Sequence, residues 1–187
     1  MRIDFSKKTW NPQDFTQVTS LRTDGRKPFM QEEDCVVNDV YKENINDYNY
    51  ISLLYKQTYN TPVEISTTCS FESFGAPLIV LTDDLISTED GYPAYGHHFE
   101  IVAYEKGINV WDLNGNAKPI KAAFNHFEVP ANEKLELKVK VLEDKLQISL
   151  YGQDMEFPIS GLPSSFRCGI TACEGVNRFY SFEVSSL

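Results

Sequence analysis

The sequence predicts an all-β protein, an antiparallel sandwich or barrel, and two observations support this class. Apolar and polar residues alternate along many segments, and clusters of Gly, Pro, Asn and Asp separate these segments from one another. Apolar residues at a spacing of three and four do not persist over three turns, so almost no helix is expected. About a dozen strands with tight turns are typical of a sandwich or barrel.

The clearest strand is 135–141, in which every second residue is apolar. There Leu135, Leu137, Val139 and Val141 are expected to face the core, and Glu136, Lys138 and Lys140 to face water. Turns are predicted at Glu143-Asp144 and at 152–154. The full set of expected strands is 48–59, 63–74, 78–83, 97–105, 108–113, 119–129, 135–141, 146–150, 155–159, 167–173 and 177–185.

The remaining segments are predicted to be connections. Residues 84–96 and 40–47 are polar and without periodicity, which favours loops, and a short helical turn is expected at 83–87. The chain has no internal repeat, no low-complexity tract and no linker composition. We therefore expect a single domain over residues 1–187.

Composition excludes several classes of function. Lys and Arg number 17 against 27 Asp and Glu, which gives a net charge of −10, and the pI is near 4.7. A nucleic-acid binder or a ligand of anionic membranes needs the opposite sign. The first thirty residues do not resemble a signal peptide, and the four cysteines form no C-x-x-C pair. Reduced thiols and a cytoplasmic location are therefore expected.

Sequence motifs of common enzymes are absent. The chain has no phosphate-binding glycine loop, no G-x-S-x-G elbow and no H-E-x-x-H. Asp112, Asn114 and Asn116 resemble the start of a calcium loop, but Ala123 stands where its closing Glu belongs. Asn114-Gly115 is better explained as a hairpin turn. No cofactor or metal is expected, with calcium the one alternative that remains open.

The segment 97–112 is the most informative for function. With a turn at Lys106-Gly107, Tyr104 would pair with Asn109 and Val102 with Trp111. Alternation then assigns a core face to Phe99, Ile101, Ala103, Ile108 and Val110, and an outer face to His98, Glu100, Val102, Tyr104, Asn109 and Trp111. Aromatic rings stack on the apolar faces of sugars, while Asn, Glu and His bind hydroxyls. The outer face is therefore either a saccharide site, with an oligosaccharide or polysaccharide fragment as partner, or an ordinary solvated surface.

Three segments resemble a known superfamily. They are the 100–111 hairpin, the 134–151 hairpin, and the closing segment RCGITACEGVNRFYSFEV at 167–184. Together they are similar to the concanavalin A-like lectin/glucanase superfamily over about residues 60–187. The resemblance implies an antiparallel two-sheet jelly-roll sandwich that binds carbohydrate on its concave sheet.

The same resemblance raises an enzymatic alternative. Family 16 glycoside hydrolases of this superfamily carry E-x-D-x-x-E, with the nucleophile first and the acid/base last. This chain has Glu100-Ile-Val-Ala-Tyr-Glu105, with Val102 in place of the Asp. Glu100 is then the leading catalytic carboxylate of a hydrolase or lyase, and Glu105 a weaker candidate that shares its face only through a bulge. A domain that serves protein contacts alone is the third interpretation.

Overall fold

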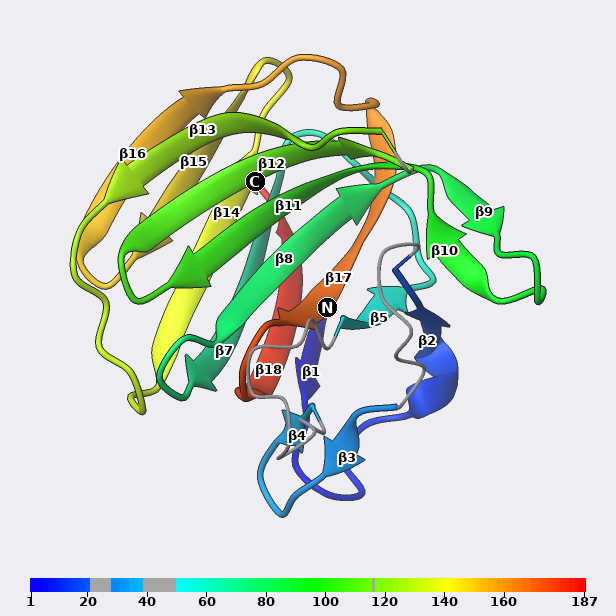
Figure 1. The fold of residues 1–187 in the computed structure, drawn as a ribbon, viewed down its shortest axis with the longest axis vertical. Helices are drawn as coiled ribbons and strands as arrows, with labels where there is room; N and C mark the ends of the chain where they lie inside the picture. Colours follow the sequence, from blue (N-terminus) through cyan, green and yellow to red (C-terminus); the bar gives the residue numbers. More distant parts are fainter. Residues whose placement is uncertain (21–27, 39–49, 116) are drawn as a thin grey trace.

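The computed structural model describes residues 1–20, 28–38, 50–115 and 117–187. In this part of the chain, two antiparallel sheets pack face to face (Figure 1). Sheet I has the order β16 (Gln153–Pro158), β15 (Lys145–Leu150), β14 (Leu135–Val141), β7 (Val63–Phe71), β18 (Asn177–Ser186), β4 (Val36–Val37) and β3 (Met30–Gln31), with β1 (Arg2–Asp4) also paired to β18. The fold class predicted from alternation is confirmed.

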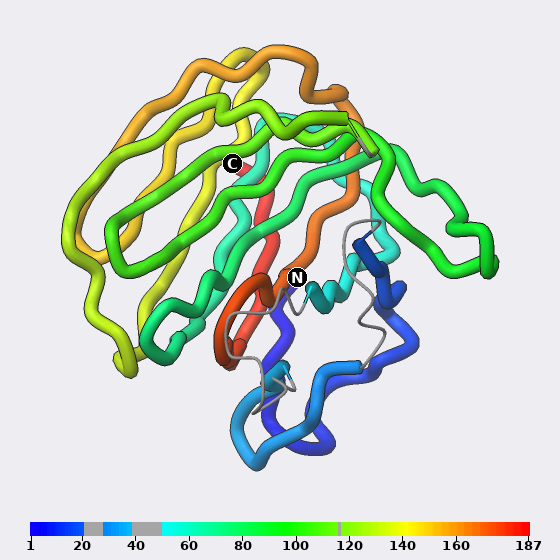
Figure 2. The backbone as a smooth tube through the Cα atoms, in the orientation of Figure 1, coloured from blue at the N-terminus to red at the C-terminus, as the bar shows by residue number. Residues whose placement is uncertain are grey.

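Sheet II lies across the core from sheet I. Its order is β13 (Ile120–His126), β12 (Gly107–Asn114), β11 (His97–Tyr104), β8 (Ala76–Thr82), β17 (Ser165–Cys173), β5 (Ile51–Tyr55) and β2 (Phe15–Val18), with β6 (Tyr59–Asn60) also paired to β17. A separate hairpin, β9 (Leu85–Ser87) and β10 (Pro93–Tyr95), projects beyond the edge of the sandwich (Figure 2). Within the described ranges, no helix is both long and apolar enough to span a membrane.

The core lies between the sheets and follows the predicted alternation. On β14, Leu135, Leu137, Val139 and Val141 are all buried, whereas Glu136 is exposed and Lys138 and Lys140 are half-buried. Their partners across the core include Ile79, Leu81 and Ile101 of sheet II. A one-residue slip would turn all four apolar side chains to solvent, so burial fixes this register. The predicted turn at Glu143-Asp144 is confirmed, because the Leu142 N–H donates to the Lys145 carbonyl across it.

Several local predictions are wrong. The helical turn expected at 83–87 is strand β9, and the loop expected at 84–96 is the β9–β10 hairpin; a short 3-10 helix, η1 (Pro12–Asp14), forms elsewhere. The strand expected at 48–59 is interrupted after Tyr55. The turn expected at 152–154 is formed by Tyr151 and Gly152, both with positive φ. The loop predicted at 40–47 lies outside the described residues.

The outer face of sheet II carries a second buried cluster. Residues of β8 that point away from the sandwich core are as buried as those that point into it: Leu78 and Val80 are both fully buried. Val18, Tyr50 and Tyr95 pack over them from three different segments. Because this cover spans only part of the sheet, the outer face continues into an open pocket beside it.

Candidate functional site

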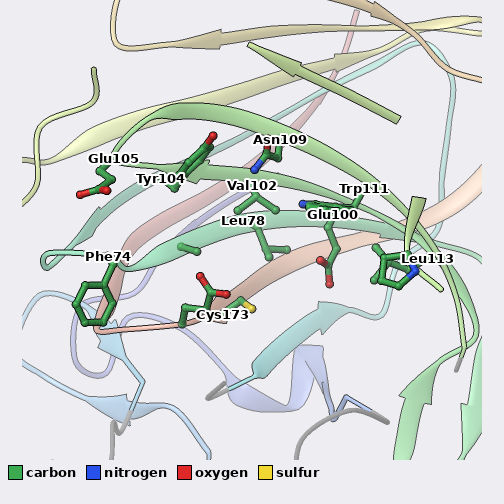
Figure 3. Close-up of a pocket in the computed structure, with 13 residues that line it drawn as sticks. Phe74, Leu78, Glu100, Val102, Tyr104, Glu105, Asn109, Trp111, Leu113 and Cys173 are labelled. Atoms are coloured by element: carbon green, nitrogen blue, oxygen red, sulfur yellow. The ribbon is translucent and has the colours of Figure 1, made fainter. Parts of the chain in front are cut away.

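A pocket of about 350 Å³ opens on the outer face of sheet II, over strands β8, β11 and β12. Its apolar floor includes Leu78 and Val102, which belong to the second buried cluster. Figure 3 shows Phe74 and Glu105 at one end of the pocket and Leu113 at the other, with Glu100 between them. Ligand pockets of about 300–1,000 Å³ with a few convergent polar groups are typical of small-molecule sites.

Five of the predicted site residues line this pocket, four of them placed there by strand alternation. Glu100, Tyr104, Asn109 and Trp111 line it from β11 and β12, and Glu105 lines it from the turn between these strands. All five residues assigned to the core face of this hairpin lie in the sandwich core. The division of the hairpin into two faces is therefore confirmed.

The register of the hairpin differs from the prediction. The turn residues are Glu105 and Lys106, so that Tyr104 pairs with Gly107 and Glu100 with Trp111. Gly107 is not a turn residue, and it allows close approach of the neighbouring strand. A Cβ atom there would lie 2.1 Å from the Asn125 carbonyl oxygen. Each pairing shifts by two residues, which leaves every side chain on its predicted face.

Glu100 is a buried carboxylate held by one neighbour. It is 7% exposed, and its Oε1 accepts a hydrogen bond of 2.6 Å from the Tyr50 hydroxyl. Among the described residues no hydrogen bond reaches Oε2, and Figure 3 shows the carboxylate directed from β11 into the pocket. Burial, followed by the charge of Glu100, raises the pKa of Tyr50 well above its usual value, so this phenol is a donor.

His98 lies behind Glu100 and does not line the pocket. Its Nδ1–H donates to the Gly96 carbonyl at 3.0 Å, its Nε2 lies 3.5 Å from Glu100 Oε1, and its ring packs against Tyr95. Because a carbonyl only accepts, Nδ1 carries a proton. The structure thus places His98 as a support for Glu100 and not as a pocket-lining contact.

The aromatic and amide groups of the pocket are half-buried. Trp111 is on β12 and Tyr104 is on the neighbouring strand β11. The Lys121 ammonium is 5.0 Å from the centre of the Trp111 ring. Asn109 Oδ1 is buried without a hydrogen-bond partner among the described residues. Both aromatic side chains combine apolar area with a polar tip, which suits a partly hydrated ligand.

Sequence reasoning did not assign several contributors to the site. Phe74 and Glu174 lie in the turns that follow β7 and β17, while Cys173 ends β17 and Tyr50 precedes β5. Leu78 shares the outer face with Glu100 by alternation, so the floor was predictable once β8 was placed beside β11. The turn residues come from distant parts of the sequence, and no local pattern brings them to β11.

The predicted calcium segment has other interactions. Asp112 Oδ1 lies 2.8 Å from His97 Nε2, and Gly115 follows β12 with positive φ in a longer connection than a two-residue hairpin turn. Residue 116 lies outside the described residues. Within the described ranges, no group of three or more His, Cys, Asp and Glu side chains is arranged to hold a metal ion. All four cysteines are free thiols, three of them buried.

Comparison with known proteins gives structural matches only. No family model matches the chain, and no curated protein matches it. Among the most similar solved structures is a Bacillus subtilis protein of unknown function with a galectin-like fold, with a TM-score of 0.70, 10% identity, and coverage of 100% of this chain and 94% of that one. Another is the carbohydrate-binding module CBM66 from Bacillus subtilis, with a TM-score of 0.65, 13% identity and coverage of 92% and 96%.

A third match is an enzyme-family structure. It is the GH16 protein of the Bacteroides ovatus mixed-linkage glucan PUL in complex with its G4G4G3G product, with a TM-score of 0.59, 10% identity and coverage of 99% of both chains. Matches at this identity establish the fold alone. The protein therefore has a concanavalin A-like jelly-roll fold.

Proposed function

We propose that this protein binds a saccharide in the pocket on the concave face of sheet II. The observation that carries the proposal is the composition of that pocket: two aromatic side chains, Trp111 and Tyr104, beside a buried carboxylate, Glu100, and an amide, Asn109. A sugar ring presents apolar C–H faces and a rim of hydroxyl donors, which this set of groups matches. The carbohydrate-binding module of similar fold supports the proposal.

The groups that would orient the ligand are held before it arrives. Glu100 is fixed by Tyr50 and flanked by His98, and Tyr95 beside them joins Ser52 in a hydrogen bond of 2.6 Å. A binding group whose position is fixed loses little conformational entropy on association. Tyr50 and His98 would therefore contribute to affinity by fixing Glu100, although neither lines the pocket.

The test of binding uses the intrinsic fluorescence of the protein. The chain has two tryptophans, Trp10 and Trp111, and Trp10 packs between Phe5 and Phe15 away from the pocket. In a Trp10→Phe background, Trp111 is the single reporter. Addition of oligosaccharides from a panel of defined linkages should shift its emission for the cognate sugar.

Substitution of Trp111, the aromatic side chain expected to stack on the sugar, then tests the site. Trp111→Ala should weaken binding by about 1–3 kcal/mol, the scale of one buried aromatic side chain. Trp10→Phe is the matched control, and it should bind as the parent protein does. Unchanged affinity of a folded Trp111→Ala protein, with its thermal midpoint measured in parallel, would exclude this pocket.

A second candidate function is cleavage of a glycosidic bond, by hydrolysis or by the elimination reaction of a polysaccharide lyase. It is favoured by three carboxylates, those of Glu100, Glu105 and Glu174, that line a single pocket. Strand β11 pairs regularly with both neighbours, so the bulge required to put Glu105 on the face of Glu100 is absent from it. Glu105 reaches the pocket from the turn instead, and Val102 occupies the position of the missing Asp.

Glu100→Gln separates the two functions. A binding protein should lose part of its affinity, because an amide keeps the shape of the side chain without the charge-assisted hydrogen bonds. A hydrolase should retain binding and lose turnover by orders of magnitude. Release of reducing ends from the bound oligosaccharide, compared between parent and variant, distinguishes these outcomes.

A further inference from the structure

We infer that the ligand of this pocket carries a positive charge and is an amino sugar, a hexosamine unit with a free ammonium group. The inference rests on the proposed saccharide function and specifies its ligand class. Two features carry it: the sign of the charges that line the pocket, and a buried carboxylate whose second oxygen accepts no hydrogen bond from the described residues.

The side chains that line the pocket are acidic or uncharged. Glu100, Glu105 and Glu174 contribute to its wall, and none of its lining residues is Lys, Arg or His. The protein as a whole adds a net charge of −10. An anionic saccharide, such as a uronate or a sulfated sugar, would enter against this field, whereas a cation would be attracted by it.

Two lysines flank the pocket and interact with residues that line it. Lys106 Nζ lies 3.5 Å from Glu105 Oε1 at the solvent-exposed turn, and the Lys121 ammonium lies over the Trp111 ring. In the part of the chain that the structure describes, Glu174 has no ion-pair partner. Lys106 therefore offsets the charge of Glu105, and the acidic character of the pocket rests on Glu100 and Glu174.

Glu100 supplies the second feature. Its side chain is 9% exposed, and its carboxylate directs into the pocket an oxygen, Oε2, that accepts no hydrogen bond from the described residues. His98 approaches the other oxygen, Oε1, which Tyr50 already occupies. A buried carboxylate is costly unless it is paired and hydrogen-bonded, so a ligand that brings both a donor and a positive charge gains most at this position.

A neutral sugar would satisfy only half of this requirement. A hydroxyl donates to Oε2, but it leaves the negative charges of the pocket without a counter-charge. The hydrogen bond from a hydroxyl is already charge-assisted on the acceptor side, and an ammonium group in its place adds the attraction of an ion pair, for which about a tenfold gain in affinity is expected. The aromatic side chains Trp111 and Tyr104 remain available for the ring of the same sugar unit.

The experiment compares sugars that differ in one substituent. Binding to the full chain is measured by calorimetry for free-amine, N-acetylated and hydroxyl forms of the same β-linked disaccharides, in both the gluco and the galacto series. The free-amine form should bind about tenfold more tightly than the hydroxyl form. Its advantage should disappear when the pH is raised above the pKa of the sugar amine.

Variants show whether the preference belongs to the pocket. Glu100→Gln, and independently Glu174→Gln, should reduce the preference for the free amine. Glu136→Gln removes the same charge from the opposite outer face, where its carboxylate is exposed, and should leave the preference unchanged. Glu174 lies in a turn, so its variant keeps the test valid if loss of the buried Glu100 charge prevents folding.

The outcomes separate the inference from the function on which it rests. Equal or tighter binding of the hydroxyl or N-acetyl forms would overturn the amino-sugar inference and leave saccharide binding intact. An equal loss in Glu136→Gln and the pocket variants would also overturn it, because the preference would then reflect net charge. Absence of binding by every sugar in the panel would overturn the proposed function itself.

Discussion

The outer faces of the two sheets are built on the same alternation and have opposite characters. On sheet I, Glu64, Lys138 and Lys140 alternate with core residues, and they form loose ion pairs of 3.8–3.9 Å near solvent. On sheet II, the corresponding positions of β8 are Leu78 and Val80, both fully buried. One outer face is a hydrated surface and the other is a second packing surface that continues into a pocket.

The difference follows from what covers each face. Sheet II is overlaid by Tyr50, Tyr95 and Val18, whereas pairs on sheet I remain near water and contribute little to stability. Cover of this kind makes a polar group on the face of sheet II costly unless it is bonded, which is why Glu100 receives the Tyr50 hydroxyl. As a result, the pocket is lined by a carboxylate, that of Glu100, whose position is fixed by a hydrogen bond.

The largest expected effect tests the packing of the covered face. Val80→Asp should place a charge in the second buried cluster and reduce the free energy of unfolding by several kcal/mol, enough to unfold the protein. Urea denaturation and circular dichroism measure the effect. A folded Val80→Asp protein with a parent-like midpoint would show that this face is open to water.

High pH should weaken the same region. Burial raises the pKa of both Tyr50 and Tyr95 above the ordinary value of 10.0. Above pH 10 these phenols ionise in the unfolded chain but not in the folded protein, so stability present below pH 10 is lost as pH rises. The loss is about 1.4 kcal/mol per group for each pH unit. Urea midpoints at pH 8 and pH 11 check this expectation, and Tyr95→Phe should reduce the slope; an unchanged slope would contradict it.

Removal of one hydroxyl tests the support of the carboxylate. Tyr50→Phe deletes the donor to Glu100 and should lower the free energy of unfolding at neutral pH by about 1.5–3 kcal/mol, the range for hydrogen bonds to charged groups. The double variant with Glu100→Gln should lose less than the sum of the two single changes. Additive losses would mean that the 2.6 Å contact contributes no coupling energy.

The smallest effect is expected on the hydrated face. Lys138→Ala removes ion pairs of 3.7–3.9 Å to Glu136 and Glu64 near solvent, and it should change the free energy of unfolding by less than about 1 kcal/mol. The change should shrink further in high salt, because exposed pairs are screened. A loss as large as that of Val80→Asp would mean that the two outer faces do not differ in kind.

Prediction from sequence succeeded where one strand contained the whole pattern. Alternation alone assigned Glu100, Tyr104, Asn109 and Trp111 to one face, and it did so despite a wrong turn position, because a two-residue shift in pairing preserves facing. It failed at 84–96, where polar composition predicted a loop and the chain forms the β9–β10 hairpin. Strands of three residues contain too few apolar side chains to show a period.

The sequence by itself determined the all-β class, the two faces of the β11–β12 hairpin and the inward parity of β14, because each depends on neighbours in one strand. Only the tertiary structure decided that Tyr50 donates to Glu100, that His98 stands behind the pocket, and that Glu174 and Phe74 complete it. These residues lie up to 124 positions apart in sequence, from Tyr50 to Glu174, and they meet because the sheet order places β8 between β11 and β17. Local pattern sets which face a side chain occupies, and long-range strand pairing sets what it meets there.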